Sequence, residues 1–368
     1  MNEAEAKLEC ISNASNPDLF GHNSAENDLL RAFHSDRLHH AWLISGPRGV
    51  GKATLAFRFA RFVLVNYETS KGLFSDAQDQ FERIESLNVS CEHPVFQRIA
   101  AGGHADLLVV EKSMNERGGL RSEIVVNDIR KAQHFLHMTA GEGGWRIVII
   151  DSADEMNTNA ANALLKLLEE PPPMALFLIV SHNADRLLPT IRSRCQKLRL
   201  QPLSNSNILD WLSKNAPNSE PADFNITCEL AEGSIGRAAE LLKLNGAGIL
   251  TDILKLLENL PNIDSVALHL FATRCSQKKD DGIFNLTIEL IRWELVRIIK
   301  YLSGVNSVNL IPKEQELLKN IADISSLDNW LEVWEKVDDL LSSVDRANLD
   351  RKQVILNTFA FVSRGGNV

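Results

Sequence analysis

The chain has 368 residues, a formal net charge of −9 at pH 7 and an ordinary globular composition, with 44% apolar and 24% charged residues. That length allows two or three domains, and the acidic balance argues against a protein that coats nucleic acid by bulk electrostatics, although a local basic strip is compatible with it. The beginning is charged, and no run of about eighteen apolar residues follows anywhere. These features predict a soluble, cytoplasmic protein with no membrane contact.

The first predicted helix has apolar spacing from Ser24 to Phe33, with Ser24 as the expected N-cap. An apolar run at 41–45 then has the character of a buried strand. A glycine-containing loop follows at 46–52, and an amphipathic helix is expected from Ala53. Strand, glycine loop and helix in that order are the setting of the phosphate-binding pattern GxxxxGK[ST].

This loop fits the phosphate-binding pattern in all but its last position. Backbone N–H groups and the helix N-terminus cradle phosphate oxygens in such loops, while a lysine reaches the terminal phosphates. The final Ser or Thr, which holds Mg²⁺, is replaced by Ala53, and Thr54 stands one residue late. We therefore predict ATP or ADP binding and expect neither tight Mg²⁺ binding nor hydrolysis; an ordinary strand-to-helix turn is the alternative. The expected nucleotide contacts are Gly46, Gly49, Val50, Gly51, Lys52, Ala53 and Thr54.

A zinc site is weakly indicated. Cys91 and His93 lie close in sequence and His104 follows, but the pattern lacks a fourth ligand, and none of the five cysteines forms a CxxC pair. We expect reduced thiols and no bound zinc.

A second chemical landmark is the apolar strand 146–150, which ends at Asp151. In phosphate-loop proteins an acid at this place lies beside the bound Mg²⁺, so Asp151 is the candidate here. A glutamate that activates water usually follows in active enzymes, but Ser152 occupies that position, with Asp154 and Glu155 further along.

The alternation of strands and helices predicts an α/β fold with a parallel sheet. Further strands are expected at 107–110, 176–180 and 196–200, and a helix at 160–170 that the prolines at 171–173 stop. Asn127 or Asp128 is the expected N-cap of another helix. The polar residues 181–183 end a strand at a place where side chains can face a terminal phosphate.

After Gln201 only helical patterns remain, the best at 283–302 with an apolar face and Gly304 at its end. We predict a nucleotide-binding-type domain at 1–200, a small helical domain at 201–248 and an all-helical domain at 249–368, whose simplest role is packing or oligomerisation.

The segments 39–43, 162–172 and 193–195 closely resemble the delta prime subunits of bacterial DNA polymerase III clamp loaders, an AAA+ family. The resemblance covers nearly the whole chain. It implies a RecA-like module, a lid and a helical collar, the collars of five subunits closing a hetero-pentameric ring above a DNA-encircling sliding clamp. It also implies work on primer-template DNA as a subunit of a nucleotidyltransferase complex.

In that family the Ser-Arg-Cys triplet supplies an arginine finger to the neighbouring subunit, which Arg194 matches. Arg237, after a Gly-Ser-Ile-Gly segment, resembles an arginine that senses the terminal phosphate within its own chain. Members with active sites carry the two residues that are replaced here by Ala53 and Ser152, so own ATPase activity is expected to be weak or absent. Many relatives hold zinc with four cysteines between the phosphate loop and the second strand, a region in which this sequence has only Cys91.

Two other functions remain open. A self-sufficient AAA+ ATPase acting on DNA or protein would use Thr54 and Asp154 in shifted roles, and a scaffold would have a loop that binds nothing. The first alternative needs chemistry that the replacements at positions 53 and 152 remove.

Overall fold

The computed structural model describes residues 13–35, 38–70, 86–115, 118–141, 144–216, 220–277, 281–305, 314–347 and 349–365. The chain forms two compact units. The first combines Met1–Trp211 with Glu232–Gly236, and the second combines Leu212–Ala231 with Arg237–Val368. The division into three domains, with a separate one at 201–248, stays a prediction.

The first unit is built on a five-stranded sheet in the order β2-β3-β4-β1-β5, in which every neighbouring pair is parallel. This confirms the predicted α/β fold class. The strands are β1 (Ala41–Ser45), β2 (Leu107–Val110), β3 (Arg146–Ile150), β4 (Ala175–Ser181) and β5 (Gln196–Arg199).

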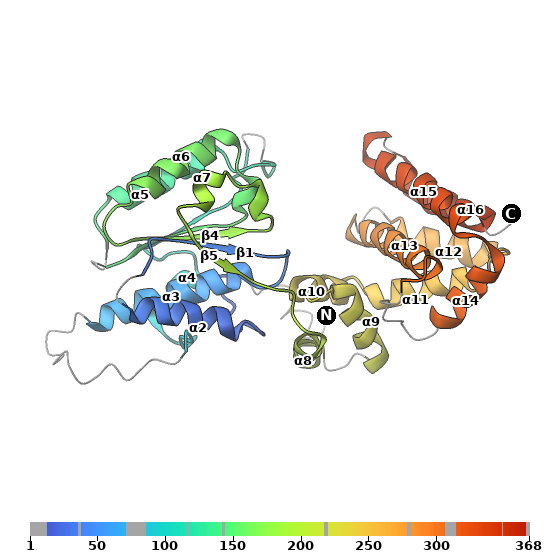
Figure 1. The fold of residues 1–368 in the computed structure, drawn as a ribbon, viewed down its shortest axis with the longest axis horizontal. Helices are drawn as coiled ribbons and strands as arrows, with labels where there is room; N and C mark the ends of the chain where they lie inside the picture. Colours follow the sequence, from blue (N-terminus) through green and yellow to red (C-terminus); the bar gives the residue numbers. More distant parts are fainter. Residues whose placement is uncertain are drawn as a thin grey trace. The chain divides into compact units, whose positions relative to one another are not determined.

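Helices cover both faces of this sheet (Figure 1). The helices α2 (Asn23–His34), α3 (Lys52–Ser70) and α4 (Pro94–Ala100) lie on one face, and α5 (Val126–His137), α6 (Thr158–Glu169) and α7 (Pro189–Arg192) lie on the other. Strand residues alternate between the two cores: Trp42 and Ile44 pack with α3, whereas Ala41 and Leu43 pack with α6. Burial on both faces explains why the central strands β1, β3 and β4 are almost continuously apolar, whereas the edge strand β5 is largely exposed and polar.

Two expected helix caps are wrong by two or three residues. Helix α2 begins at Asn23, so Ser24 lies in its first turn and His22 is the N-cap residue. Helix α5 begins at Val126, and Asp128 instead lies in its first turn, where its carboxylate accepts the N–H of Val125 at 3.2 Å. The N-cap of α6 is Asn157, because its Oδ1 accepts the N–H of Ala160 at 2.9 Å.

Beyond β5 the described residues form helices and no strand. The apolar face predicted for 283–302 is confirmed, since Ile291, Leu295 and Ile298 are buried, and Gly304 follows the helix with a φ of +75°. The helices are α8 (Asn205–Asn215), α9 (Pro221–Ala231), α10 (Ile235–Lys243), α11 (Gly246–Leu257), α12 (Ser265–Cys275), α13 (Asp281–Leu302), α14 (Glu314–Ile324), α15 (Leu327–Ala347) and α16 (Arg351–Gly365).

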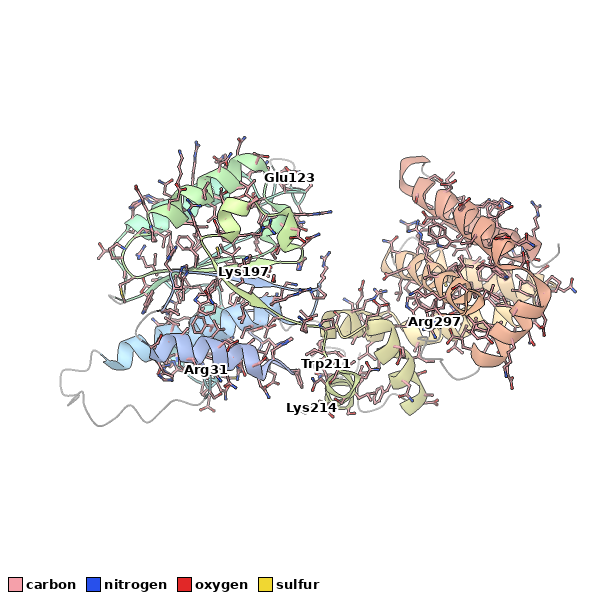
Figure 2. All side chains as sticks on the ribbon, viewed as in Figure 1. Arg31, Glu123, Lys197, Trp211, Lys214 and Arg297 are labelled. Atoms are coloured by element: carbon pink, nitrogen blue, oxygen red, sulfur yellow. The ribbon has the colours of Figure 1, made fainter. Side chains whose placement is uncertain are left out.

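The second unit encloses a charged cluster between α13 and α14. Arg297, labelled in Figure 2, forms a two-point ion pair with Glu314: Nε to Oε1 and Nη2 to Oε2 are both 2.5 Å. Its guanidinium carbon also lies 4.4 Å from the centre of the Trp293 ring. Glu294 is buried beside this pair, and neither of its carboxylate oxygens has a hydrogen-bond partner among the described residues.

None of the helices in the described part of the chain is both long and apolar enough to cross a membrane. Within the same residues, no three His, Cys, Asp or Glu side chains gather in a way that could hold a metal ion. The ring nitrogens of His93 and His104 instead accept backbone N–H groups two residues later.

Candidate nucleotide-binding site

The candidate site lies at the carboxyl edge of the sheet, where β1, β3 and β4 end together. Ser45 at the end of β1 pairs with Ser181 of β4, and Ile150 at the end of β3 pairs with Ile179 of the same strand. The glycine loop, Asp151 and the residues after Ser181 therefore leave the sheet at one edge. Ligands of open α/β sheets bind at this edge.

The glycine loop packs closely against neighbouring backbone. Gly49 has a φ of +75°, and a Cβ added there would lie 2.3 Å from Oγ of Ser234 and 3.2 Å from Cα of Gly236. The carbonyl of Gly49 also accepts the N–H of Gly236 at 2.9 Å. At Gly46 a Cβ would lie 2.4 Å from the Leu200 carbonyl oxygen. Both positions therefore require glycine for reasons of contact as well as backbone conformation.

Lys52 is folded back onto its own loop. Its side chain donates to the carbonyls of Gly46 at 2.8 Å and Pro47 at 2.5 Å, and the residue is only 3% exposed. Burial lowers the pKa of Lys52 to about 8, although the charges of Asp154 and Asp151 partly oppose the shift. An ammonium group has three N–H donors, so one remains for a phosphate oxygen. The residue thus fits an anion at the start of α3.

The residues after Lys52 offer poor ligands for Mg²⁺. Ala53 has no side-chain oxygen, and Thr54, which has one, is 6% exposed.

His22, which precedes α2, contacts the glycine loop: its Nε2 lies 2.7 Å from the Val50 carbonyl oxygen. A carbonyl can only accept, so this ring nitrogen donates; burial lowers the pKa of His22 and favours the neutral ring.

Beyond the loop, a serine–histidine pair occupies the edge next to Lys52. Ser152 has a φ of 62°, and its Oγ lies 3.1 Å from Nε2 of His182. Asp154, which lies in the short helix Ala153–Glu155, accepts the backbone N–H of His182 at 2.8 Å and so links the segment after β3 to the segment after β4. Burial, and then the charge of Lys52, lowers the pKa of His182. The sequence placed 181–183 near the phosphates but gave no sign of these cross-strand bonds.

The Ser-Arg-Cys triplet follows α7 in the same unit. Cys195 is anchored in the core below α6, and burial raises its pKa to about 12, so it is an uncharged packing residue. Arg194, whose side chain is 36% exposed, forms an ion pair with Glu169 at 2.8 Å and donates to the Thr190 carbonyl at 3.0 Å. The triplet therefore buries the side chain of Cys195 and leaves that of Arg194 partly exposed.

Arg237, the other predicted arginine, belongs to the second unit. It is 2.8 Å from a carboxylate oxygen of Glu240 and 2.6 Å from one of Glu289, both in that unit. Its role as a sensor of the terminal phosphate stays a prediction.

Taken together, a glycine loop between a parallel strand and its helix, with an acid at the end of a second strand, defines a phosphate-loop α/β protein. Residues 21–204, half of the chain, match the family described as "DNA polymerase III, delta subunit". The chain belongs to this family, which confirms the resemblance to clamp-loader delta prime subunits.

Two curated relatives illustrate the likeness. The "DNA polymerase III subunit delta'" of Pseudomonas aeruginosa is 35% identical over 210 residues, or 57% of each chain, and that of Bacillus subtilis is 34% identical over 206 residues, or 55% of each. The chain thus spans little more than half the length of these relatives. Among solved structures, a gamma-subunit-related protein of DNA polymerase III from Thermotoga maritima is 20% identical, with 93% of this chain and 99% of that one covered and a TM-score of 0.41.

Proposed function

We propose that this chain is a delta prime type subunit of a clamp loader, which joins other loader subunits in a five-membered ring and helps to place a sliding clamp on primer-template DNA. In this proposal the chain hydrolyses little or no ATP itself. It supplies Arg194 to the ATP site of a neighbouring subunit. The curated relatives that carry the names delta' and gamma support the assignment to this complex.

The proposed lack of ATP hydrolysis by this chain is supported by the groups that its glycine loop lacks. It offers backbone N–H groups and Lys52 to a nucleotide, which fits ATP or ADP as a structural ligand. The metal that would withdraw charge from the phosphates needs an oxygen where Ala53 stands, and the group that would activate water is replaced by Ser152. Ser152 is instead hydrogen-bonded to His182.

The single observation that carries the active role is the presentation of Arg194. Its neighbour Cys195 fixes the backbone in the core, while the guanidinium lies partly exposed beside α6. In phosphoryl transfer, charge spreads over the equatorial oxygens of the moving group, and an arginine from another subunit can raise the rate by roughly 10³ to 10⁵. The guanidinium provides the planar, forked set of donors that this stabilisation uses.

The test is the ring reconstituted with Arg194→Ala or Arg194→Lys. We expect both variants to fold and assemble, as judged by gel filtration, and to suppress single-turnover hydrolysis at the facing ATP site by at least about 10³-fold. Lysine should rescue little, because it lacks the planar fork. Sites that receive arginines from other subunits keep their activity, so clamp loading has to be measured beside bulk turnover.

Unaltered clamp loading and single-site hydrolysis by the assembled Arg194→Ala ring would refute the proposed role of Arg194. Turnover by the purified chain alone distinguishes the competing ATPase function. Rapid Mg²⁺-dependent hydrolysis that Lys52→Ala abolishes would show a self-sufficient ATPase and would refute the proposal that this chain hydrolyses little or no ATP.

A further inference from the structure

The last turn of α6 and the short helix α7 each hold the guanidinium of Arg194 at one point. Nη2 lies 2.8 Å from Oε1 of Glu169, the final residue of the helix, and Nη1 donates to the Thr190 carbonyl at 3.0 Å. Because two different nitrogens of one planar group are engaged, these contacts fix both its position and the orientation of its plane. No feature of the Ser-Arg-Cys triplet itself identifies Glu169.

The surroundings of this pair favour a fixed cation. The carboxyl end of a helix carries a partial negative charge, so the end of α6 adds to the attraction of the Glu169 carboxylate. The two side chains are 36% and 44% exposed, which keeps the ion pair weak and the guanidinium accessible from solvent. Arginine has five N–H donors, and the two contacts to described residues use two of them, so three can face a phosphate. A phosphate can therefore bind without displacing Glu169.

We propose that Glu169 is a positioning residue for Arg194: it orders the guanidinium in advance toward the terminal phosphate of a nucleoside triphosphate bound to the neighbouring subunit. The inference rests on the proposed function of Arg194. A long side chain without such a partner loses rotamer freedom when it meets the transition state, whereas a pre-ordered one has already lost part of it. We therefore expect Glu169 to raise the rate of the chemical step of hydrolysis.

The test uses the full chain in the assembled ring, with the other ATP sites inactivated through their own loop lysines. Glu169→Gln should lower the single-turnover rate at the remaining site about fivefold, equivalent to ~1 kcal/mol, with little change in ATP affinity. The matched control is Glu170→Gln, which removes the same charge from the next residue, also exposed at the end of α6. This control should keep the parental rate.

A double-mutant cycle separates positioning from a structural role. Glu169→Gln should have no further effect once Arg194 is alanine, because the group that it orders is gone. Thermal unfolding midpoints of the Glu169 and Glu170 variants should match those of the parent.

Each other outcome refutes a definite claim. If Arg194→Ala slows hydrolysis but Glu169→Gln leaves the rate unchanged or raises it, the positioning role is wrong and the proposed function stands. An equal loss in Glu170→Gln, or a full Glu169 effect without Arg194, would show a general charge or structural effect and overturn the inference. If Arg194→Ala has no effect, the proposed function fails and the inference fails with it.

Discussion

Glu294 provides a direct test of the electrostatics inside the second unit. The residue is 1% exposed, and its two carboxylate oxygens have no hydrogen-bond partner among the described residues. Burial and the nearby charge of Glu314 raise its pKa to about 8, against the opposing charge of Arg297. At neutral pH this carboxyl group therefore holds its proton, whereas in the unfolded chain it titrates near its ordinary pKa of about 4.3.

The sign of the pH effect follows from that difference. Below about pH 4.3 both states are protonated and Glu294 costs no ionisation energy. As the pH rises toward 8, the unfolded state loses its proton first, so the free energy of unfolding falls by ~1.4 kcal/mol per pH unit. The full shift corresponds to at most ~5 kcal/mol. Glu294→Gln introduces a neutral side chain of similar shape and removes this pH-dependent loss of stability. The variant should therefore gain stability over the parent as the pH increases.

Urea unfolding followed by tryptophan fluorescence, at several pH values from 5 to 8, measures this gain. Taking the difference between variant and parent cancels the titration of all other groups. We expect parent and variant to differ little near pH 5 and the variant to be more stable by several kcal/mol at pH 8, up to the ~5 kcal/mol bound. Glu316→Gln, an exposed change on α14, is the control and should show no such trend. A difference for Glu294→Gln that stays constant with pH would refute the raised pKa.

Two further predictions concern the glycine loop. A phosphate near Lys52 favours its charged amine, so ATP binding should take up close to one proton at pH 9 and almost none at pH 7. Calorimetry in two buffers with different ionisation enthalpies measures this proton uptake. Uptake that persists in Lys52→Ala would contradict the prediction. Gly49→Ala should destabilise the chain by ~1–3 kcal/mol more than Gly102→Ala, since both glycines have positive φ but only Gly49 has atoms within 4 Å of an added Cβ. Equal losses in the free energy of unfolding by urea for the two variants would show that the close contacts around Gly49 do not require glycine.

The sequence predicts the sheet well because its signals are local. The strands β1 to β4 are short, mainly apolar runs, and the lengths of the connecting segments allow parallel crossovers. The N-cap of α6 at Asn157 is a local feature of the same kind, since cap and helix are adjacent in the sequence. The cap errors at Ser24 and Asp128 arise where several polar residues in one turn can all serve, so that only the observed backbone distinguishes them.

Contacts between distant segments could not be predicted in this way. The approach of Ser234 and Gly236 to Gly49 depends on how the chain returns to the first unit after α9. The bond between Ser152 and His182 likewise requires β3 and β4 to be neighbours in register. Periodicity gives the strands but not the order in which they pair. Residues that act through tertiary neighbours therefore remain hidden even when the motif is recognised.

The two halves of the proposed function place opposite demands on the same unit. A loop that turns over ATP has to release its lysine to the phosphates and admit a metal, whereas Lys52 is bound to two carbonyls of its own loop and Ala53 offers no ligand. An arginine that serves a neighbour benefits from a backbone that stays fixed, and Cys195 and Glu169 hold Arg194 from two sides. Loss of hydrolysis within the chain is thus compatible with catalysis at the ATP site of a neighbouring subunit. The hydrogen bonds of Lys52 and the missing ligand at Ala53 do not alter the contacts that hold the Arg194 guanidinium.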